Sequence, residues 1–572
     1  MNFVLVAVNA KYIHSSASVR GLSAYARAQG APVFEAREFT INQSEGYISA
    51  QLFRMKPDAV FFSCYIWNIG LIVQVIKTLR KVCPQVRIVC GGPEASYEYE
   101  SLLSVADVVA VGEGEATFVH LLRHFAEGTP DLCGIPGIAF RDDKGTRFTG
   151  QVPPLDLADI PFTYDEEGLA SLSNRILYYE ASRGCPFRCQ YCLSSAGRGV
   201  RYLPLPRVFA DLAFFLAHGV KQVKFIDRTF NGNPERAFAI CQFLMDNDNG
   251  ITNFHFEAAA GLLNDALIDC FRTARKGLFQ LEIGVQSTNP ETLAAIQRPN
   301  DYGKLAEAVR AINEAGRTHL HLDLIAGLPH EGYGSFGRSF NDVYALAPQQ
   351  LQLGFLKLLK GSGLRRNAGQ YGIVGMDAAP YEVLFTAALP HEDVLRLKDI
   401  ENVLDMFYNA GRFKRALACL VRQYDTPFAF YEALAGYWIE NGFEGYAHNR
   451  VQMYTRLRDF CIENHTDAVP LVTDMLLYDL LETGKVSLSD WMRICEPLAA
   501  VQRRFYDDAQ AIAAIAPHLA KHPSSHLHRT CRLAHLRHDA DTGALRDAYY
   551  LFDYHAGGGV AVYDATDYIR SE

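Results

Sequence analysis

Three cysteines, Cys185, Cys189 and Cys192, form a CxxxCxxC pattern at the end of a strand-like run at 176–182. A 4Fe-4S cluster normally takes four cysteine ligands, so a loop that supplies three leaves one iron free to bind a group that is not protein. The alternative is a structural zinc site, which prefers four ligands, commonly as two CxxC pairs. The chain has no second CxxC, and the rest of its 13 cysteines are scattered. The spacing therefore predicts a cluster with one open iron.

Length and composition predict a multidomain globular protein. With 572 residues, 49% hydrophobic and 21% charged, the chain has material for three or four domains of ordinary size. A net charge of −9 disfavours a general nucleic-acid surface. No stretch of about 18 apolar residues occurs, so no membrane contact is expected. The first residues are typical of a strand and not of a signal peptide, and the odd number of cysteines fits a reducing compartment, so we expect a cytoplasmic protein.

The first part of the chain, 1–133, alternates strand-like and helix-like segments. Short apolar runs at 3–8, 33–39, 59–62, 87–90 and 107–111 are each followed by a longer amphipathic stretch. This alternation predicts an α/β domain of the Rossmann or flavodoxin-like type, with a parallel sheet covered on both faces. Such sheets bind ligands beyond the carboxyl ends of their strands.

The loops after the third, fourth and fifth of these strands are unusual. They read Ser63-Cys-Tyr-Ile-Trp-Asn68, Gly91-Gly-Pro-Glu-Ala-Ser96 and Gly112-Glu-Gly-Glu115. Glycines let a backbone approach a bulky ligand closely, and Tyr65 and Trp67 offer flat apolar surface. For any single loop, the glycines could simply turn the chain from strand to helix. Three such loops at the same edge of the sheet, which we call its rim, favour a ligand site.

The rest of the chain divides into three further segments. Residues 134–170 are rich in Pro, Gly and Asp and predict a linker. Between 171 and 370 the alternation resumes, with strands expected at 176–182, 222–227, 253–259, 279–286, 318–326 and 350–357. Six such units predict a partial (β/α)6 barrel with its site at the carboxyl ends of the strands. Amphipathic segments in 371–572 predict a largely α-helical carboxyl-terminal domain.

Polar residues stand near the ends of the predicted barrel strands. They are Asp227, Glu257, Glu282, Gln286 and Asp323. Carboxylates and amides at this edge suit a ligand with charged and hydrogen-bonding groups. For Glu282 and Asp323, pairing with neighbouring basic residues is an equally good interpretation.

The cysteine motif, with Tyr191 before its last cysteine, resembles that of the radical S-adenosylmethionine (SAM) enzymes. In that family the open iron chelates the amino and carboxylate groups of SAM, and an electron from the cluster breaks the sulfonium to give a 5'-deoxyadenosyl radical. The resemblance implies SAM contacts at Glu257 and Gln286, and at Tyr191 through its backbone beside adenine. It allows Asp227 to face either SAM or substrate.

The Gly-Gly-Pro and Gly-Glu-Gly-Glu loops resemble the cobalamin-binding domain of one class of radical SAM enzymes. The DxHxxG sequence that ligates cobalt in many cobalamin proteins is absent, so cobalt is expected without a protein imidazole, with His14 as the alternative. Segments at 352–361 and 433–438 resemble a subfamily with a helical carboxyl-terminal domain of unassigned role. The resemblance implies that the following residues contact cobalamin: Asn9, Ser63, Tyr65, Trp67, Asn68, Gly91, Gly92, Pro93, Glu94, Gly112 and Glu113.

Together these resemblances imply methylation of an unactivated carbon, with a 4Fe-4S cluster, SAM and cobalamin as cofactors. Rearrangement, cyclisation or ring contraction without methyl transfer stays open, and so does a non-catalytic cobalamin sensor. A methylthiotransferase would need a second cluster, for which Cys64, Cys83, Cys90 and Cys133 are spaced too irregularly. The expected partners are an electron donor such as flavodoxin or ferredoxin and a substrate that is a small molecule or peptide in preference to RNA. No catalytic residue is assigned.

Six histidines lie between Pro517 and His538. Some of them are spaced at i, i+4 and could share a helix face that binds a metal or an anion. A solvated variable surface is the other interpretation, and no function is inferred from the segment.

Overall fold

The computed structural model describes residues 1–195, 197, 199–555 and 559–570. The chain separates into two compact units. The first comprises Met1–Ser339, Leu346–Pro348 and Leu353–Val394, and the second comprises Phe340–Ala345, Gln349–Gln352 and Leu395–Glu572. The two predicted cofactor domains therefore lie within one unit, except for the last segments of the barrel.

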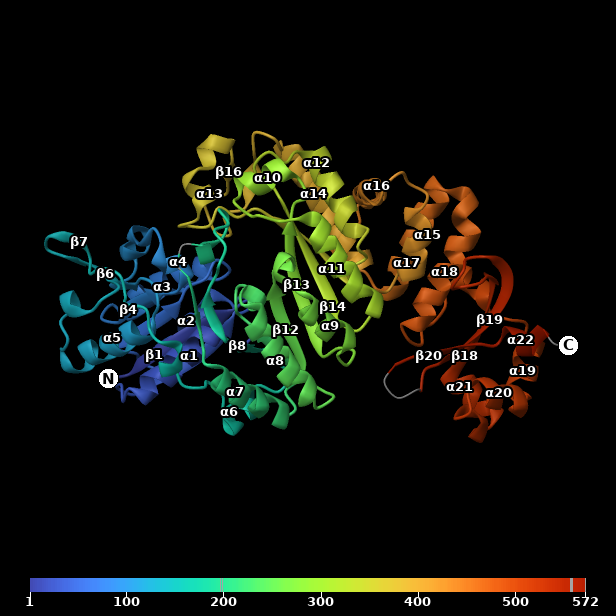
Figure 1. The fold of residues 1–572 in the computed structure, drawn as a ribbon, viewed down its shortest axis with the longest axis horizontal. Helices are drawn as coiled ribbons and strands as arrows, with labels where there is room; N and C mark the ends of the chain where they lie inside the picture. Colours follow the sequence, from blue (N-terminus) through green and yellow to red (C-terminus); the bar gives the residue numbers. More distant parts are fainter. Residues whose placement is uncertain (196, 198, 556–558, 571–572) are drawn as a thin grey trace. The chain divides into compact units, whose positions relative to one another are not determined.

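The amino-terminal domain is the predicted parallel sheet covered on both faces (Figure 1). Its strands are β1 (Phe3–Asn9), β2 (Phe34–Thr40), β3 (Ala59–Ser63), β4 (Arg87–Gly91) and β5 (Val108–Ala110), paired in the order β2-β1-β3-β4-β5. The covering helices are α1 (Ala17–Ala28), α2 (Glu45–Arg54), α3 (Ile69–Val82) and α5 (Glu115–Glu127).

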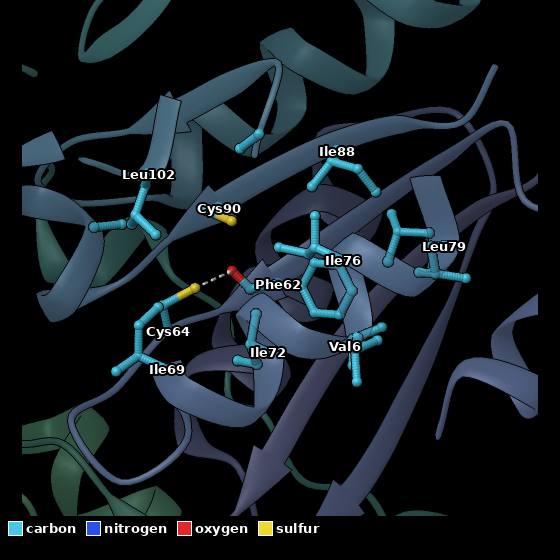
Figure 2. Close-up of a cluster of buried hydrophobic side chains, with 14 of the residues drawn as sticks. Val6, Phe62, Cys64, Ile69, Ile72, Ile76, Leu79, Ile88, Cys90 and Leu102 are labelled. Atoms are coloured by element: carbon cyan, nitrogen blue, oxygen red, sulfur yellow. Dashed lines mark hydrogen bonds between the residues drawn. The ribbon is translucent and has the colours of Figure 1, made fainter. Parts of the chain in front are cut away.

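Side-chain alternation along the strands divides the core of this domain between the two faces of the sheet. Val4, Val6 and Val8 of β1 pack into one buried cluster with residues of α2 and α3, part of which is drawn in Figure 2. Phe3 and Leu5 pack on the other face with residues of α1 and α5. Both faces of β1 are buried, which is typical of a central strand in a parallel sheet.

The prediction of a linker at 134–170 is wrong for part of that segment. Two further strands, β6 (Ile138–Asp142) and β7 (Gly145–Phe148), add to β5 as an antiparallel hairpin and give the sheet seven strands. Ile138, Ala139 and Phe140 are buried, so they belong to the core of the domain. The surrounding prolines and glycines hid this short apolar run in the sequence.

The second domain is the predicted partial barrel, whose six strands pair in chain order. They are β8 (Leu177–Tyr179), β11 (Gln222–Phe225), β12 (Asn253–Ala258), β13 (Phe279–Gln286), β14 (His319–Ala326) and β15 (Gln350–Phe355). The intervening helices are α7 (Leu205–Ala217), α8 (Pro234–Asp246), α9 (Asp265–Thr273), α11 (Tyr302–Ala315) and α12 (Tyr333–Tyr344), in green and yellow-green in Figure 1. A small antiparallel hairpin, β9 (Ser182–Gly184) and β10 (Val200–Tyr202), brackets the cysteine motif.

The second unit is largely helical, as predicted, but it also contains a sheet. Its longer helices are α16 (Pro427–Glu440), α17 (Arg450–Asn464) and α18 (Val469–Glu482). Near the chain end, β18 (Cys531–His538), β19 (Leu545–Asp553) and β20 (Ala561–Asp564) form a three-stranded antiparallel sheet. In the described parts of the chain, no helix is both long and apolar enough to cross a membrane.

The histidine-rich segment spans different elements and does not form one helix face. His526 and His528 lie in the short helix α21 (Ser524–Thr530), whereas His535 and His538 lie in β18. His538 contacts Asp474 at 2.7 Å, and His535 contacts Asp547 at 3.2 Å. His535 and His538 therefore pair with carboxylates of the same unit.

Candidate active site at the cluster loop

The cysteine motif lies in the loop that joins β9 to β10. Cys189 is buried, while Cys185 and Cys192 are partly exposed. The backbone N–H of Gln190 donates to the carbonyl of Ile296 at 2.9 Å, and the N–H of Leu364 donates to the carbonyl of Gln190 at 2.8 Å. Two segments distant in sequence therefore hold the middle of the loop in place.

Glycine is required where the hairpin meets the loop. Gly184 has φ +108°, and a Cβ there would lie 2.3 Å from the carbonyl oxygen of Gly199. L side chains rarely adopt this φ, and the backbone contact leaves no space for one. The close approach of these two residues brings the ends of the cysteine loop together.

The three thiols fit the donor set of a cluster with an open iron. A 4Fe-4S cluster normally takes four cysteine thiolates, one on each iron, so three cysteines leave one iron open. Cys185, Cys189 and Cys192 stand in one loop and would hold such a cluster. Among the described residues, no group of three or more His, Cys, Asp or Glu side chains is arranged to hold one metal ion.

Arg298 is a residue of this site that the sequence did not reveal. Its Nη1 lies 3.6 Å from Cys189 Sγ, and its Nη2 donates to the carbonyl of Gly284 at 2.5 Å. Burial alone would lower the pKa of this guanidinium, but Tyr191 and the thiols of Cys189 and Cys185 raise it above its usual range. A buried cation beside the cysteines would stabilise a cluster that carries negative charge.

The predicted SAM residues are Gln286 of β13, which approaches Gly284 as Arg298 does, and Glu257 of the neighbouring strand β12. Gln286 has φ +71° and is buried, and within the described structure its Oε1 has no hydrogen-bond partner. A Cβ at Gly284 would lie 2.1 Å from Gln286 Nε2, so the missing side chain makes room for the amide. Burial raises the pKa of Glu257, and the charge of Arg228 opposes this shift. A buried acceptor without a partner fits a polar ligand such as SAM.

Glu282 and Asp323 follow the ion-pair interpretation. Glu282 Oε2 lies 2.9 Å from Lys224 Nζ and 3.1 Å from His255 Nε2. Burial would raise the pKa of Glu282, but hydrogen bonds and charges from His255 and Lys224 lower it well below its usual range. Asp323 Oδ1 lies 3.0 Å from His321 Nε2. Glu282 therefore links β13 to β12 and β11, whereas Asp323 and His321 lie on the same strand, β14.

Asp227 is occupied by the backbone that leads to the cluster loop. Its Oδ1 accepts from the N–H of Ala181 at 2.8 Å, and its Oδ2 accepts from Ser182 Oγ at 2.5 Å. Burial raises the pKa of Asp227 to about 7, against the effect of these hydrogen bonds. Because both oxygens are bound to β9 and the residue before it, we infer that Asp227 positions this strand in place of contacting SAM.

The rim loop after β3 is held in place by hydrogen bonds of Asn68 and presents aromatic side chains. Asn68 is buried, and its Nδ2 donates to the carbonyls of Val8 at 2.9 Å and Ser63 at 3.1 Å. Trp67 is 45% exposed and stacks on Tyr65, with ring centroids 4.3 Å apart. Asn68 therefore shapes the loop, and the stacked pair is the part available to a flat ligand such as a corrin.

The rim loops after β4 and β5 differ in what their glycines do. Gly92 has φ +101°, and a Cβ there would lie 2.6 Å from the Cys64 carbonyl oxygen, so this glycine serves internal packing. Gly112 has φ +90° with open space beside it. Gly91 is partly buried and ends β4, and Pro93 is exposed at the start of the short helix α4 (Pro93–Ser96). Only Gly112 leaves its backbone open to a ligand in the way predicted.

Like Asn68, three more of the predicted cobalamin residues have protein partners. Glu94 accepts from the Tyr381 hydroxyl at 2.8 Å. Glu113 forms ion pairs with Arg183 and Arg201 of the β9/β10 hairpin. Asn9 Nδ2 donates to Glu38 at 2.8 Å. These side chains organise the rim, and their predicted contact with cobalamin gains no support from the geometry.

Ser63 and His14 complete the rim at β1 and β3. Ser63 Oγ lies 3.0 Å from Ser18 Oγ, within hydrogen-bond distance. His14 Nδ1 lies 2.6 Å from the hydroxyl of Tyr178, which belongs to β8 of the barrel. Burial and the charge of Lys11 lower the pKa of His14. The loop after β1 therefore contacts the first strand of the barrel.

Three segments of the chain match known protein families. Residues 4–122 match the B12 binding domain, residues 179–343 match the Radical SAM superfamily, and residues 369–550 match a family described as "Protein of unknown function (DUF4080)". The two cofactor matches coincide with the amino-terminal sheet and the partial barrel.

Individual relatives are similar to slightly less than half of the chain. Over 304 residues, the chain is 28% identical to the cobalamin-dependent radical SAM methyltransferase TokK of Streptomyces tokunonensis. This match covers 49% of this chain and 44% of the relative. It is 27% identical to the anaerobic magnesium-protoporphyrin IX monomethyl ester cyclase of Synechocystis sp., over 43% of this chain and 50% of the relative. The chain thus spans about half the length of these relatives or less.

The fold is shared with a solved structure. The cobalamin-dependent SAM radical enzyme OxsB with aqua-cobalamin bound matches with a TM-score of 0.59 at 15% identity, over 84% of this chain and 80% of OxsB. The fold and the matched domains define a protein with a cobalamin-binding domain and a radical SAM barrel. The chain therefore combines a B12 binding domain with a radical SAM domain, and its cofactors are a 4Fe-4S cluster, SAM and cobalamin.

Proposed function

We propose that this protein methylates an unactivated carbon of its substrate. The observation that supports the proposal is the direct contact between the loop after β5, where cobalamin is predicted to bind, and the hairpin that carries the cysteine loop, through Glu113 and Arg183. When bound, the cluster and SAM would supply a 5'-deoxyadenosyl radical and cobalamin would supply a methyl group. Such a reaction requires the three groups to be held in line and shielded from water.

The side chains of the site would divide this work. Cys185, Cys189 and Cys192 would hold the cluster, and Arg298 would balance its charge from 3.6 Å behind Cys189. Gln286, with its free buried oxygen, and Glu257 would hold the polar groups of SAM. Tyr65 and Trp67 would lie against the corrin, because stacked aromatic rings present a flat apolar face.

We propose the substrate and the electron donor only by their chemical class. We expect a small molecule or a peptide as substrate, since the net charge of −9 opposes RNA. An electron carrier of the flavodoxin or ferredoxin type would reduce the cluster.

The proposal is tested with SAM that carries a deuterated methyl group. The protein is reconstituted anaerobically with iron, sulfide and cobalamin, supplied with a reductant, and incubated with a cell extract. We expect 5'-deoxyadenosine and a product heavier by the labelled methyl group, and neither with the Cys189→Ala variant. Formation of 5'-deoxyadenosine without any labelled product would contradict methyl transfer.

Cyclisation is the second candidate, and the similarity to the magnesium-protoporphyrin cyclase favours it over other rearrangements. The same experiment separates the two reactions. A cyclase would consume SAM and alter a substrate in the extract without adding labelled carbon.

A further inference from the structure

The β9/β10 hairpin places two arginines opposite each other. In its antiparallel register Arg183 pairs with Arg201, and the loop between these strands holds the three cysteines. Like charges directly opposite each other on neighbouring strands are destabilising. The hairpin that carries the cluster loop therefore needs carboxylates from elsewhere.

The loop after β5 of the first domain and the start of α5 supply two of those carboxylates, Glu113 and Glu115. Glu113 Oε2 lies 3.1 Å from Arg183 Nη1 and 3.3 Å from Arg201 Nη1, so one carboxylate bridges both guanidiniums. Glu115 Oε1 lies 2.8 Å from Arg183 Nη2. Glu180, which precedes the hairpin, accepts from Arg183 at 2.8 and 3.0 Å.

The charge of Arg183 is secured by these partners. Its guanidinium lies 3.1 Å from Glu113 and 2.8 Å from both Glu115 and Glu180. The side chains of Arg183, Glu113 and Glu115 are 22, 27 and 10% exposed, so solvent screens the network only in part. Removing Glu113 would take away the carboxylate that bridges Arg183 and Arg201.

We propose that Glu113 and Glu115 together with Arg183 and Arg201 form an interdomain latch that sets the distance between the corrinoid and the cluster. This inference rests on the proposed function, because it assigns a role to the contact between the two cofactor sites. Glu113 follows Gly112, the rim glycine with open space beside it, and Arg183 stands two residues before Cys185. The four residues are positioning residues, and none of them is assigned a contact with a cofactor.

The first test measures the distance between the two metal centres. In the reconstituted full chain, cob(II)alamin and the reduced cluster each carry an unpaired spin, and their dipolar coupling by pulsed EPR reports their separation. We expect Arg201→Gln and Glu113→Gln to broaden this coupling while iron and cobalamin contents stay at the wild-type level. Labelled product per 5'-deoxyadenosine should fall by about ten- to a hundredfold, because a small misplacement is costly in such reactions.

Two further variants serve as controls. Arg201→Lys keeps the charge and should recover part of the coupling. Arg80→Gln breaks an ion pair with Asp107, 2.6 Å away, that lies within the first domain, and it should leave the coupling unchanged. A wild-type coupling in both Arg201→Gln and Glu113→Gln would overturn the latch. The latch would also be overturned if these variants lost iron but showed the wild-type coupling in the molecules that keep their iron.

A second measurement does not depend on the cofactors. Hydrogen exchange of the apo protein should become faster in Arg201→Gln both at 112–116 and at 182–184, because the latch joins these segments across domains. Unchanged exchange at 112–116 would overturn the latch. If the wild type bound no cobalamin, the proposed function would fail while this exchange result would still stand.

Discussion

Burial sets the charge state of single carboxyl groups beside the predicted SAM site. Glu331 is 1% exposed, and its Oε1 accepts from Ser287 Oγ at 2.7 Å and Ser339 Oγ at 2.9 Å. Ser287 directly follows Gln286 in the sequence. Burial raises the pKa of Glu331 to about 7, although the two serine hydrogen bonds lower it. The protonated acid is therefore favoured in the folded protein more than in the unfolded chain.

Glu331 gives a prediction for stability against pH. A carboxyl group whose pKa is raised on folding contributes stability that is fully present below its unfolded pKa, near 4, and is lost as pH rises through about 7. The Glu331→Gln variant resembles the neutral acid, so it should keep up to about 3 kcal/mol that the wild type loses by pH 8.5. Denaturant unfolding of both proteins at pH 5.5 and pH 8.5 measures this. Equal pH dependence in the two proteins would contradict the assignment.

Trp67 gives a second prediction at this scale, for the corrinoid. Its ring is half-exposed and stacks on Tyr65. Trp67→Ala should weaken cobalamin binding about tenfold, while iron content stays unchanged. Trp67→Phe, which keeps a flat ring, should bind nearly as well as the wild type. Cobalamin titration followed by absorbance measures the affinity, and unaltered binding by Trp67→Ala would show that the corrinoid lies elsewhere.

Single residues could be predicted from the sequence where the signal is local. The three cysteines lie within eight consecutive positions, and loop geometry fixes their proximity. Arg298 could not be found in this way, because it lies 109 positions from Cys189 and reaches it only when the barrel closes. The resemblance implies that Glu94 and Glu113 contact cobalamin, and this stays a prediction. Their partners Tyr381 and Arg201 belong to distant segments, so these contacts could not be predicted from the sequence.

The hairpin of β9 and β10 is the element on which the cluster loop depends most. Its close backbone contact requires Gly184, where a Cβ would meet the Gly199 carbonyl at 2.3 Å. Gly184→Ala should destabilise the protein by about 1–3 kcal/mol and lower the iron content after reconstitution. Gly21→Ala is the matched control, because Gly21 lies within α1 with open space around it, and it should leave both quantities unchanged or slightly improved. Full iron content in Gly184→Ala would contradict this role.

Elements with a clear period were predictable, and those with mixed composition were not. The barrel alternates apolar runs with amphipathic ones, so the strand predicted at 279–286 spans Phe279–Gln286 in the structure, as β13. The β6/β7 hairpin was missed because prolines and glycines surround its few apolar residues. Strand β18 could not be predicted, because its polar and apolar residues alternate only in part, with Leu533 and Ala534 both buried. Its pairing with β19 identifies it as a strand.

At the scale of the whole molecule, the chain divides near residue 394 and not at the end of the barrel. The second unit includes Phe340–Ala345, a part of helix α12 that the sequence assigned to the barrel. Phe340 is fully buried, and its ring centroid lies 5.5 Å from that of Phe428 and 5.7 Å from that of Tyr431. Sequence periodicity locates helices but not the unit in which their side chains are buried, so this division could not be predicted.

Tyr431 gives the prediction for this scale. It is fully buried in the second unit. Tyr431→Ala should destabilise that unit by about 3–5 kcal/mol, and hydrogen exchange should speed up in α16 and at 340–345. Exchange at residues 1–330 should stay as in the wild type. Faster exchange throughout the chain would contradict two separate units.

The central claim is that three cysteines of this chain hold a cluster whose open iron binds SAM. Electron–nuclear double resonance on the reduced, reconstituted protein tests it directly, with SAM carrying ¹⁵N in its amino group. We predict a ¹⁵N hyperfine coupling to the cluster, which requires the amino nitrogen to be bonded to iron. An intact, reduced cluster that shows no coupling in the presence of excess SAM would contradict the account.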